Sequence, residues 1–363
     1  MSSPAKDVFL IGPGLIGADL IELLLQDDYT ITTLVRRSEH AEQIKQHYPS
    51  AKIIIGTLDD FDLIRQHTAS HSITIHAATA DHLPSVEAVL AGVRERAAGG
   101  LPTIYIHTSG TSCLVDNSRG MYISDRIYSD SRPDEIDAIP PDAPHRAIDL
   151  AILAARKQLA TRAKIIVILP TLVYGVGKHI PRLSIQLPTM TRFALKHGFA
   201  PVIGKGLSVR CNIHVQDLVR AYMVILRWME RSSAEEVLRN PYFFCENGEE
   251  MLWRDAAAEI GRQLYQAGRI EDPEPRNVPK ELYPDLFGPY SPTTVGANSR
   301  SRGDRLRELG WNPREKNVLA SFREDELPLL LAENEQFNGY AGVASSGTHV
   351  LKSLEESGLT AMS

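Results

Sequence analysis

A glycine-rich turn near the start of the chain constrains the fold more than any other feature. Residues 8–11 form an apolar run that leads directly into Gly12, Gly14 and Gly17, in the spacing G-x-G-x-x-G. The first glycine permits a tight strand-to-helix turn, the second lets the backbone approach a pyrophosphate, and the third allows close helix packing. Leucines recur at roughly helical spacing over residues 15–24. The pattern predicts a dinucleotide-binding βαβ unit rather than an ordinary glycine turn in a globular core.

Two arginines follow the next apolar run. Arg36 and Arg37 stand about 20 residues after the glycines, where an NAD-binding protein usually carries Asp or Glu for the ribose hydroxyls. Guanidinium groups instead suit the 2′-phosphate of NADP, because they form bidentate hydrogen bonds to phosphate oxygens. We therefore predict that Arg36 selects NADP(H) over NAD(H). The alternative is that both arginines simply lie at the start of a solvent-exposed helix.

Composition and charge exclude several classes of protein. The chain of 363 residues is 43% hydrophobic and carries a net charge of −6 without a basic stripe, which argues against a nucleic-acid partner. Apolar runs are too short to span a membrane and the first strand begins too early for a signal peptide, so we expect a cytoplasmic protein without a membrane partner. Cys113, Cys211 and Cys245 have neither paired nor metal-type spacing, which predicts reduced thiols and no metal site.

Short β-branched runs alternate with segments of helical length along the first half of the chain. The runs are 53–55, 73–75, 104–106 and 165–169. They are apolar throughout, as expected when helices cover both faces of a parallel sheet. We predict a Rossmann-type, doubly wound α/β sheet with a smaller C-terminal substrate lobe. The dinucleotide-binding domain is expected to comprise residues 1–170 and 212–246, the lobe residues 171–211 and 247–330, and a tail residues 331–363.

Five later segments accompany the glycine turn as motifs: His76–Thr79, Thr108–Thr111, Pro170–Gly175, His214–Leu218 and Leu309–Pro313. Together these motifs resemble the extended short-chain dehydrogenase/reductase superfamily, in its NAD-dependent epimerase/dehydratase branch, over about residues 6–320.

The resemblance extends the set of residues expected to bind the cofactor. Thr57 stands where the family usually has an aspartate that contacts the adenine, which leaves Leu58 to wall the ring. Taken with the glycines and arginines, the predicted cofactor-binding residues are Gly12, Gly14, Leu15, Ile16, Gly17, Arg36, Arg37, Leu58, Ala77, Ala78, Thr79, Thr108, Pro170, Leu172 and Val173.

The family's catalytic Tyr-x-x-x-Lys pair is absent from the helix expected before residues 165–169. His145 and Asp149 occupy its two positions, and residues four apart share one helix face. With Asp142 as a cap and Pro144 in the first turn, His145 lies at the positive helix end, which should lower its pKa. The Asp149 carboxylate should instead raise the pKa of His145. A carboxylate bonded to one ring nitrogen leaves the other free to exchange a proton, so we predict a general acid/base.

A structural role for this pair is the alternative. In that case His145 caps or packs locally, and Asp149 meets Arg146 or Arg156 on a solvated face. Ser109 is the third predicted catalytic residue, because it ends a parallel strand where ligands gather in this architecture and can hydrogen-bond a substrate oxygen. Its alternative role is to cap the following loop.

Three classes of function follow. The first is an atypical NADP(H)-dependent reductase that acts on a small carbonyl-bearing metabolite, with His145 or Ser109 supplying the proton. The second is a non-redox isomerase, dehydratase or cyclase that uses His145 and Asp149 as acid and base. The third is an NmrA-like dinucleotide sensor without turnover, against which a placed acid/base counts. We favour the first, with a small-molecule substrate as partner, and the resemblance implies a homodimer.

Overall fold

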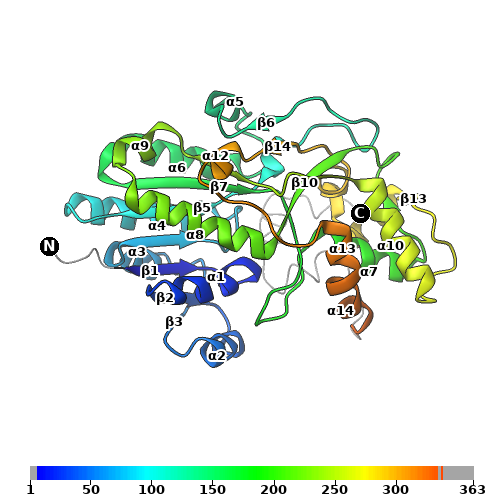
Figure 1. Ribbon diagram of the computed structural model, residues 1–363, viewed down its shortest axis with the longest axis horizontal. Coiled ribbons are helices and arrows are strands. Elements are labelled where there is room, and N and C mark those ends of the chain that lie inside the picture. Colours follow the sequence, from blue (N-terminus) through cyan, green and yellow to red (C-terminus); the bar gives the residue numbers. More distant parts are fainter. Residues whose placement is uncertain (1–5, 334–336, 338–363) are drawn as a thin grey trace.

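The computed structural model describes residues 6–333 and residue 337, and is built around a parallel sheet of seven strands (Figure 1). The strand order is β11-β7-β5-β4-β1-β2-β3, and every pair is parallel. The strands are β1 Asp7–Ile11, β2 Thr30–Val35, β3 Lys52–Ile55, β4 Ile73–His76, β5 Ile104–Thr108, β7 Lys164–Pro170 and β11 Tyr242–Cys245. The strand order reverses beside β1, so the predicted doubly wound fold is confirmed, with its ligand-binding switch point at the carboxyl ends of β1 and β4.

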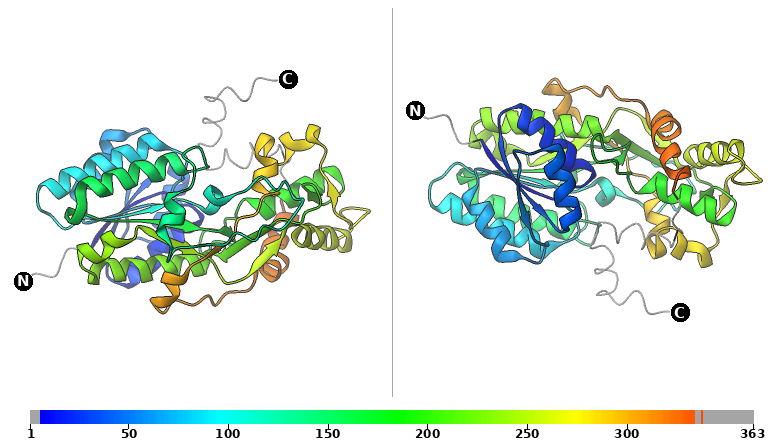
Figure 2. Two further views of the ribbon diagram at one scale, coloured as in Figure 1. Left: turned by 90° about the horizontal axis from the view of Figure 1, so that it is seen from above. Right: turned by 90° about the horizontal axis from the view of Figure 1, so that it is seen from below.

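Helices cover both faces of this sheet (Figure 2). Val8 and Leu10 belong to a core with residues of α1 and α8, whereas Phe9 and Ile11 belong to a core with residues of α3, α4 and α6. Alternate side chains of β1 therefore enter opposite cores, which explains the continuous apolar run. The helices are α1 Leu15–Gln26, α2 Ser38–His47, α3 Phe61–Ser70, α4 Leu83–Ala98, α6 Arg146–Leu159 and α8 Val215–Arg231.

A third core lies in the C-terminal part of the chain, around the fully buried Trp253 and Phe322. A small sheet of order β12-β10-β8 adjoins it, and α7 and α10 pack on one another. These elements are β8 Leu172–Tyr174, β10 Val209–His214, β12 Glu250–Leu252, α7 Gln186–His197, α10 Trp253–Gln266, α13 Val318–Ser321 and α14 Leu327–Leu331. The proposed domain boundaries stay a prediction.

The remaining strands and α-helices are short. They are β6 Tyr128–Ser129, α5 Pro133–Asp137, β9 Pro201–Val202, α9 Ala234–Arg239, β13 Arg276–Asn277, α11 Ser291–Thr294, β14 Ser301–Arg302 and α12 Asp304–Glu308. The three cysteines are buried and unpaired. In the described part of the chain, no helix has the length and hydropathy needed to cross a membrane. The predicted tail lies outside the described residues except for 331–333 and 337.

Candidate functional site

The glycine turn is packed so tightly that side chains are excluded from it. Gly12 has a φ of +92°, and a Cβ there would lie 2.3 Å from the Ala78 Cα. A Cβ at Gly17 would lie 2.3 Å from the Gly12 carbonyl oxygen. Gly14 caps α1 without a side-chain hydrogen bond to the first amides of the helix. The turn therefore leaves a helix amino terminus open to a phosphate, as a dinucleotide site requires.

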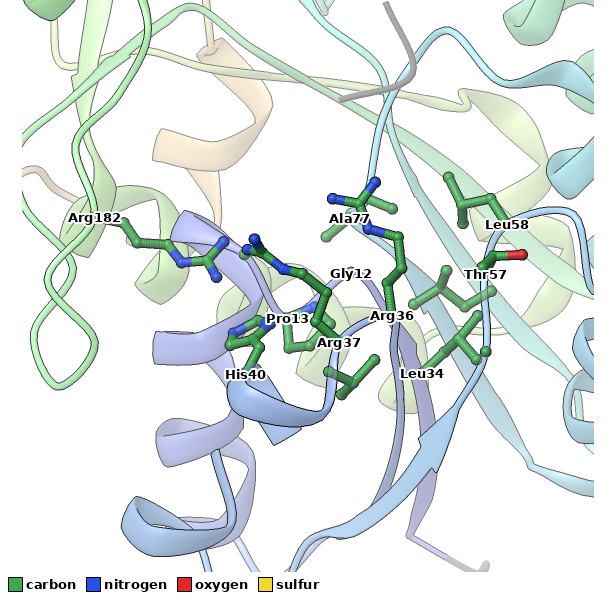
Figure 3. Close-up of a pocket in the computed structure, with 15 residues that line it drawn as sticks. Gly12, Pro13, Leu34, Arg36, Arg37, His40, Thr57, Leu58, Ala77 and Arg182 are labelled. Carbon is green, nitrogen blue, oxygen red and sulfur yellow. The ribbon is translucent and has the colours of Figure 1, made fainter. Parts of the chain in front are cut away.

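A hollow opens in front of this turn (Figure 3). The predicted cofactor residues that line it are Gly12, Gly14, Arg36, Arg37, Leu58, Ala77 and Ala78. Several further residues that were not predicted also line the hollow: Ile11, Pro13, Leu34, Val35, His40, Gly56, Thr57 and Arg182. The walls of the hollow come from the carboxyl ends of β1, β2, β3 and β4, which is where ligands bind in this fold.

The other predicted cofactor residues lie outside this lining. Leu15, Ile16 and Gly17 form the first turn of α1. The Thr79 hydroxyl accepts a hydrogen bond from the Asp81 amide, and the Thr108 hydroxyl is paired with the Tyr222 hydroxyl. Pro170 ends β7, and Leu172 and Val173 belong to β8.

The hollow has a strongly positive rim. Arg36 and Arg37 are exposed at the end of β2, and Arg182 reaches toward Arg37 and His40 from the loop after β8 (Figure 3). Burial, together with the charges of Arg37 and Arg36, lowers the pKa of Arg182 below its usual range. Burial also lowers the pKa of His40 to about 4, so this imidazole is neutral at pH 7. The open turn and the positive rim can hold the phosphate groups of a dinucleotide.

The second predicted site lies at the start of α6. His145 is the N-cap residue of this helix, with a φ of +66°, and its side chain makes no capping hydrogen bond. The predicted helix start at Asp142 and Pro144 is therefore wrong. Turns closed by hydrogen bonds from Ala143 N–H to Pro140 O and from Arg146 N–H to Ala143 O replace the first helical turn.

Asp81, rather than Asp149, is the carboxylate that binds the His145 ring. Its Oδ1 lies 2.7 Å from His145 Nδ1, while Nε2 lies on the side of Gly110, where a Cβ would be 3.4 Å away. Burial works to lower the pKa of His145, but the hydrogen bond and charge of Asp81 and the charge of Asp149 outweigh it. The pKa is raised, contrary to the lowering expected from the helix terminus.

Asp149 is buried beside His145 and Ser109. Burial raises the pKa of its carboxyl to about 6, against the opposing effects of the neighbouring Ser109 hydroxyl and the charges of His145 and Arg146. Neither Asp149 Oδ1 nor Ser109 Oγ has a clear hydrogen-bond partner among the described residues. The alternative of a solvated face for Asp149 is wrong, because this side chain is 1% exposed and Arg146 and Arg156 bond elsewhere. The three predicted catalytic residues do lie together.

A buried arginine that contacts the turn after β5 carried no recognisable sequence signal. Arg210 on β10 is 3% exposed, and its Nη2 donates a 3.0 Å hydrogen bond to Ser112 Oγ, just beyond β5. Its Nε and Nη1 have no hydrogen-bond partner within the described chain. Burial lowers the pKa of this guanidinium to about 10, so it stays charged at pH 7. Unpaired donors of this kind can bind an oxygen acceptor on a ligand.

Comparison with known proteins agrees with this architecture. The model of the NAD dependent epimerase/dehydratase family matches residues 9–238. A protein named oxidase ucsJ from Acremonium sp. is 27% identical over 326 residues, which cover 85% of this chain and 93% of that protein. An uncharacterized protein, YLL056C of Saccharomyces cerevisiae, is 23% identical over 327 residues, covering 87% of this chain and 97% of its own length.

Solved structures show the same fold at lower identity. A dTDP-glucose 4,6-dehydratase from Bacillus anthracis in complex with NAD has a TM-score of 0.62 and 16% identity, and the match covers 91% of this chain and 98% of that one. A UDP-glucose 4-epimerase from Thermotoga maritima has a TM-score of 0.60 and 15% identity, with coverage of 88% and 99%.

Proposed function

The chain belongs to the NAD dependent epimerase/dehydratase family, and we propose that it acts as an NADP(H)-dependent reductase of a small carbonyl-bearing metabolite. The observation that carries the proposal is the 2.7 Å contact between His145 Nδ1 and Asp81 Oδ1, beside Ser109 and Asp149. The loop after β4 links this contact to the hollow, because Ala77 and Ala78 line the hollow and Asp81 lies three residues beyond.

The bound cofactor supplies the hydride, and the remaining chemistry belongs to the protein. In our proposal the Ser109 hydroxyl orients the substrate carbonyl oxygen, and His145 Nε2 donates the proton that this oxygen takes up. Asp81 fixes the ring through Nδ1 and favours its protonated form. Ionised Asp149 favours the same form, which links proton donation to the state of both carboxyls.

Two observations limit the substrate and the reaction. The unpaired donors of Arg210 favour a substrate with an oxygen acceptor beyond the carbonyl itself. The name of the Acremonium relative, an oxidase, supports a redox reaction.

A non-redox isomerase, dehydratase or cyclase is the second candidate. It is favoured by one observation, the raised pKa of Asp149, about 6, beside a histidine whose pKa is also raised. A carboxyl group with a raised pKa next to an imidazole can serve with it as paired acid and base.

The test begins with titration of the purified protein with NADPH and NADH, in which nicotinamide fluorescence reports binding. The NADPH complex is then incubated with a panel of aldehydes and ketones while oxidation of the nicotinamide is recorded. Oxidation that is lost in His145→Phe, with NADPH still bound, supports the reductase. Tight binding of NADPH without its oxidation by any compound of the panel favours the non-redox reaction or the NmrA-like sensor.

A further inference from the structure

The loop between β8 and α7 crosses from the C-terminal part of the chain to the dinucleotide site. We call residues 175–185 the strap. Its base is closed by an antiparallel bridge between Val176 and Leu183 and by a 3.1 Å hydrogen bond from Gly177 N–H to Arg182 O. Figure 1 shows this loop beside α1. The strap is therefore a closed turn rather than a loose connection.

The strap is fastened to α1 at two acidic residues. The Lys178 amide donates to Asp19 Oδ2 at 3.0 Å, and Lys178 Nζ lies 2.8 Å from Glu22 Oε1. His179 Nε2 lies 3.3 Å from Glu22 Oε2, and its ring packs edge-on against Tyr48. These contacts hold the strap against the helix that begins at the glycine turn.

The strap carries Arg182 to the rim of the hollow. Its Nη1 lies 3.9 Å from where a Cβ on Gly14 would be, and its side chain points toward Arg37 and His40 (Figure 3). The charges that act most strongly on Arg182 are both positive, those of Arg37 and Arg36, and no ion pair is recorded for it in the described part of the chain. Guanidinium groups gathered in this way repel one another unless an anion lies between them.

We infer that Arg182 on the strap completes, with Arg36 and Arg37, a three-arginine site for the 2′-phosphate of NADP(H). The inference rests on the proposed use of NADP(H). It assigns much of the discrimination between NADP(H) and NAD(H) to a residue outside the β2–α2 turn. Arg182 also lies near Gly14, where a pyrophosphate would bind, so the competing role is a contact common to NAD(H) and NADP(H).

The test compares ligands that differ only by the 2′-phosphate. Calorimetry measures the binding of ADP-ribose and 2′-phospho-ADP-ribose, neither of which can undergo hydride transfer, to the wild type and to Arg182→Ala. Arg94→Ala, which removes an exposed arginine on α4, is the matched control. We expect Arg182→Ala to weaken the binding of 2′-phospho-ADP-ribose about tenfold, equivalent to about 1.4 kcal/mol, and the binding of ADP-ribose less than about twofold. Arg94→Ala should change neither.

The outcomes separate the inference from the function on which it rests. A wild type that binds both ligands equally contradicts the proposed use of NADP(H), and the three-arginine site falls with it. A wild-type preference that Arg182→Ala retains overturns the inference alone. Equal weakening of both ligands also overturns it, because Arg182 then contacts the shared pyrophosphate.

Discussion

Asp81 Oδ1 lies 2.7 Å from His145 Nδ1, so the loop after β4 holds the imidazole at the start of α6. The two residues are 64 positions apart in the chain. One loop thereby contributes to both sites, because its first residues, Ala77 and Ala78, line the hollow. The contact gives His145 a fixed orientation that a helix cap alone would not give.

Asp81→Asn should slow turnover and shift its pH dependence. Because the Asp81 carboxylate raises the pKa of His145, its loss should make protonated His145 disappear at lower pH, so reductase activity should decline earlier as pH rises. We expect kcat to fall about 10- to 100-fold, with little change in NADPH affinity. Steady-state kinetics across pH provide the measurement. Asp285→Asn, which breaks the 2.9 Å His197–Asp285 pair, is the control. An unchanged pH profile would count against the proton-donor role of His145.

Asp149→Asn should remove an ionisation from the activity profile. Burial raises the pKa of Asp149 to about 6, and its ionised form favours protonated His145. Activity of the wild type should therefore rise as pH increases through about 6, and the variant should lack this rise. The profile of kcat/KM against pH checks it, with circular dichroism to establish that the variant is folded. If wild type and variant lose activity in the same way at acidic pH, Asp149 is not the group whose ionisation causes this loss.

Gly12→Ala should abolish dinucleotide binding. A Cβ at this position would lie 2.3 Å from the Ala78 Cα, and the φ of +92° disfavours any side chain. Gly198→Ala is a matched control, since Gly198 also has a positive φ of +76° but no atom of the described residues lies within 4 Å of its Cβ position. Only the first variant should lose the thermal stabilisation that NADPH gives to the wild type. Retained stabilisation in Gly12→Ala would contradict binding at this turn.

The fold was predictable because its signals are local in the sequence. The apolar runs, the glycine spacing and the arginines after β2 each occupy a few consecutive residues, and the strands β3, β4, β5 and β7 lie where the runs predict. Two of the missed residues, Asp81 and Arg182, instead act through contacts with distant parts of the chain. Asp81 meets His145 across 64 positions, and Arg182 reaches Gly14 through a strap whose path depends on contacts with α1. No pattern within either segment indicates these meetings.

The start of α6 was mispredicted for a local reason. Asp142 and Pro144 form a typical helix-start signature, but the chain turns twice before the helix begins at Arg146. This shift places His145 in a left-handed conformation at the N-cap, with Asp81 at its ring. The error in the helix boundary is thus also the reason that the wrong carboxylate was assigned to the histidine.

Glu22→Gln should loosen the strap. Lys178 and His179 both bond to Glu22, and the two contacts are partly exposed, so each should contribute only modestly. We expect NADPH to dissociate faster, by about two- to fivefold, because Arg182 is held less firmly over the hollow. Stopped-flow fluorescence measures the rate. Glu95→Gln, which breaks a surface pair with Arg65, is the control and should leave dissociation unchanged. Equal rates for wild type and Glu22→Gln would show that the strap is held by other contacts.

Glu326, which contacts the base of the strap, should make the stability of the folded protein depend on pH. Its Oε1 accepts a 3.1 Å hydrogen bond from Gly175 N–H, and burial raises the pKa of its carboxyl to about 7. The folded protein therefore keeps a proton that the unfolded chain has lost above pH 4.5, the ordinary pKa of this group.

The free energy of unfolding should consequently fall as pH rises from about 4.5 to 7, with a limiting slope of about 1.4 kcal/mol per pH unit from this group. Glu326→Gln cannot ionise and its amide oxygen can still accept from Gly175, so its curve should be flatter by up to that amount. Urea unfolding at several pH values measures the difference, with Glu281→Gln as an exposed control. Asp130, whose pKa burial also raises to about 7, leaves a residual slope in every variant. Parallel curves for wild type and Glu326→Gln would mean that Glu326 ionises in the folded protein as it does in the unfolded chain.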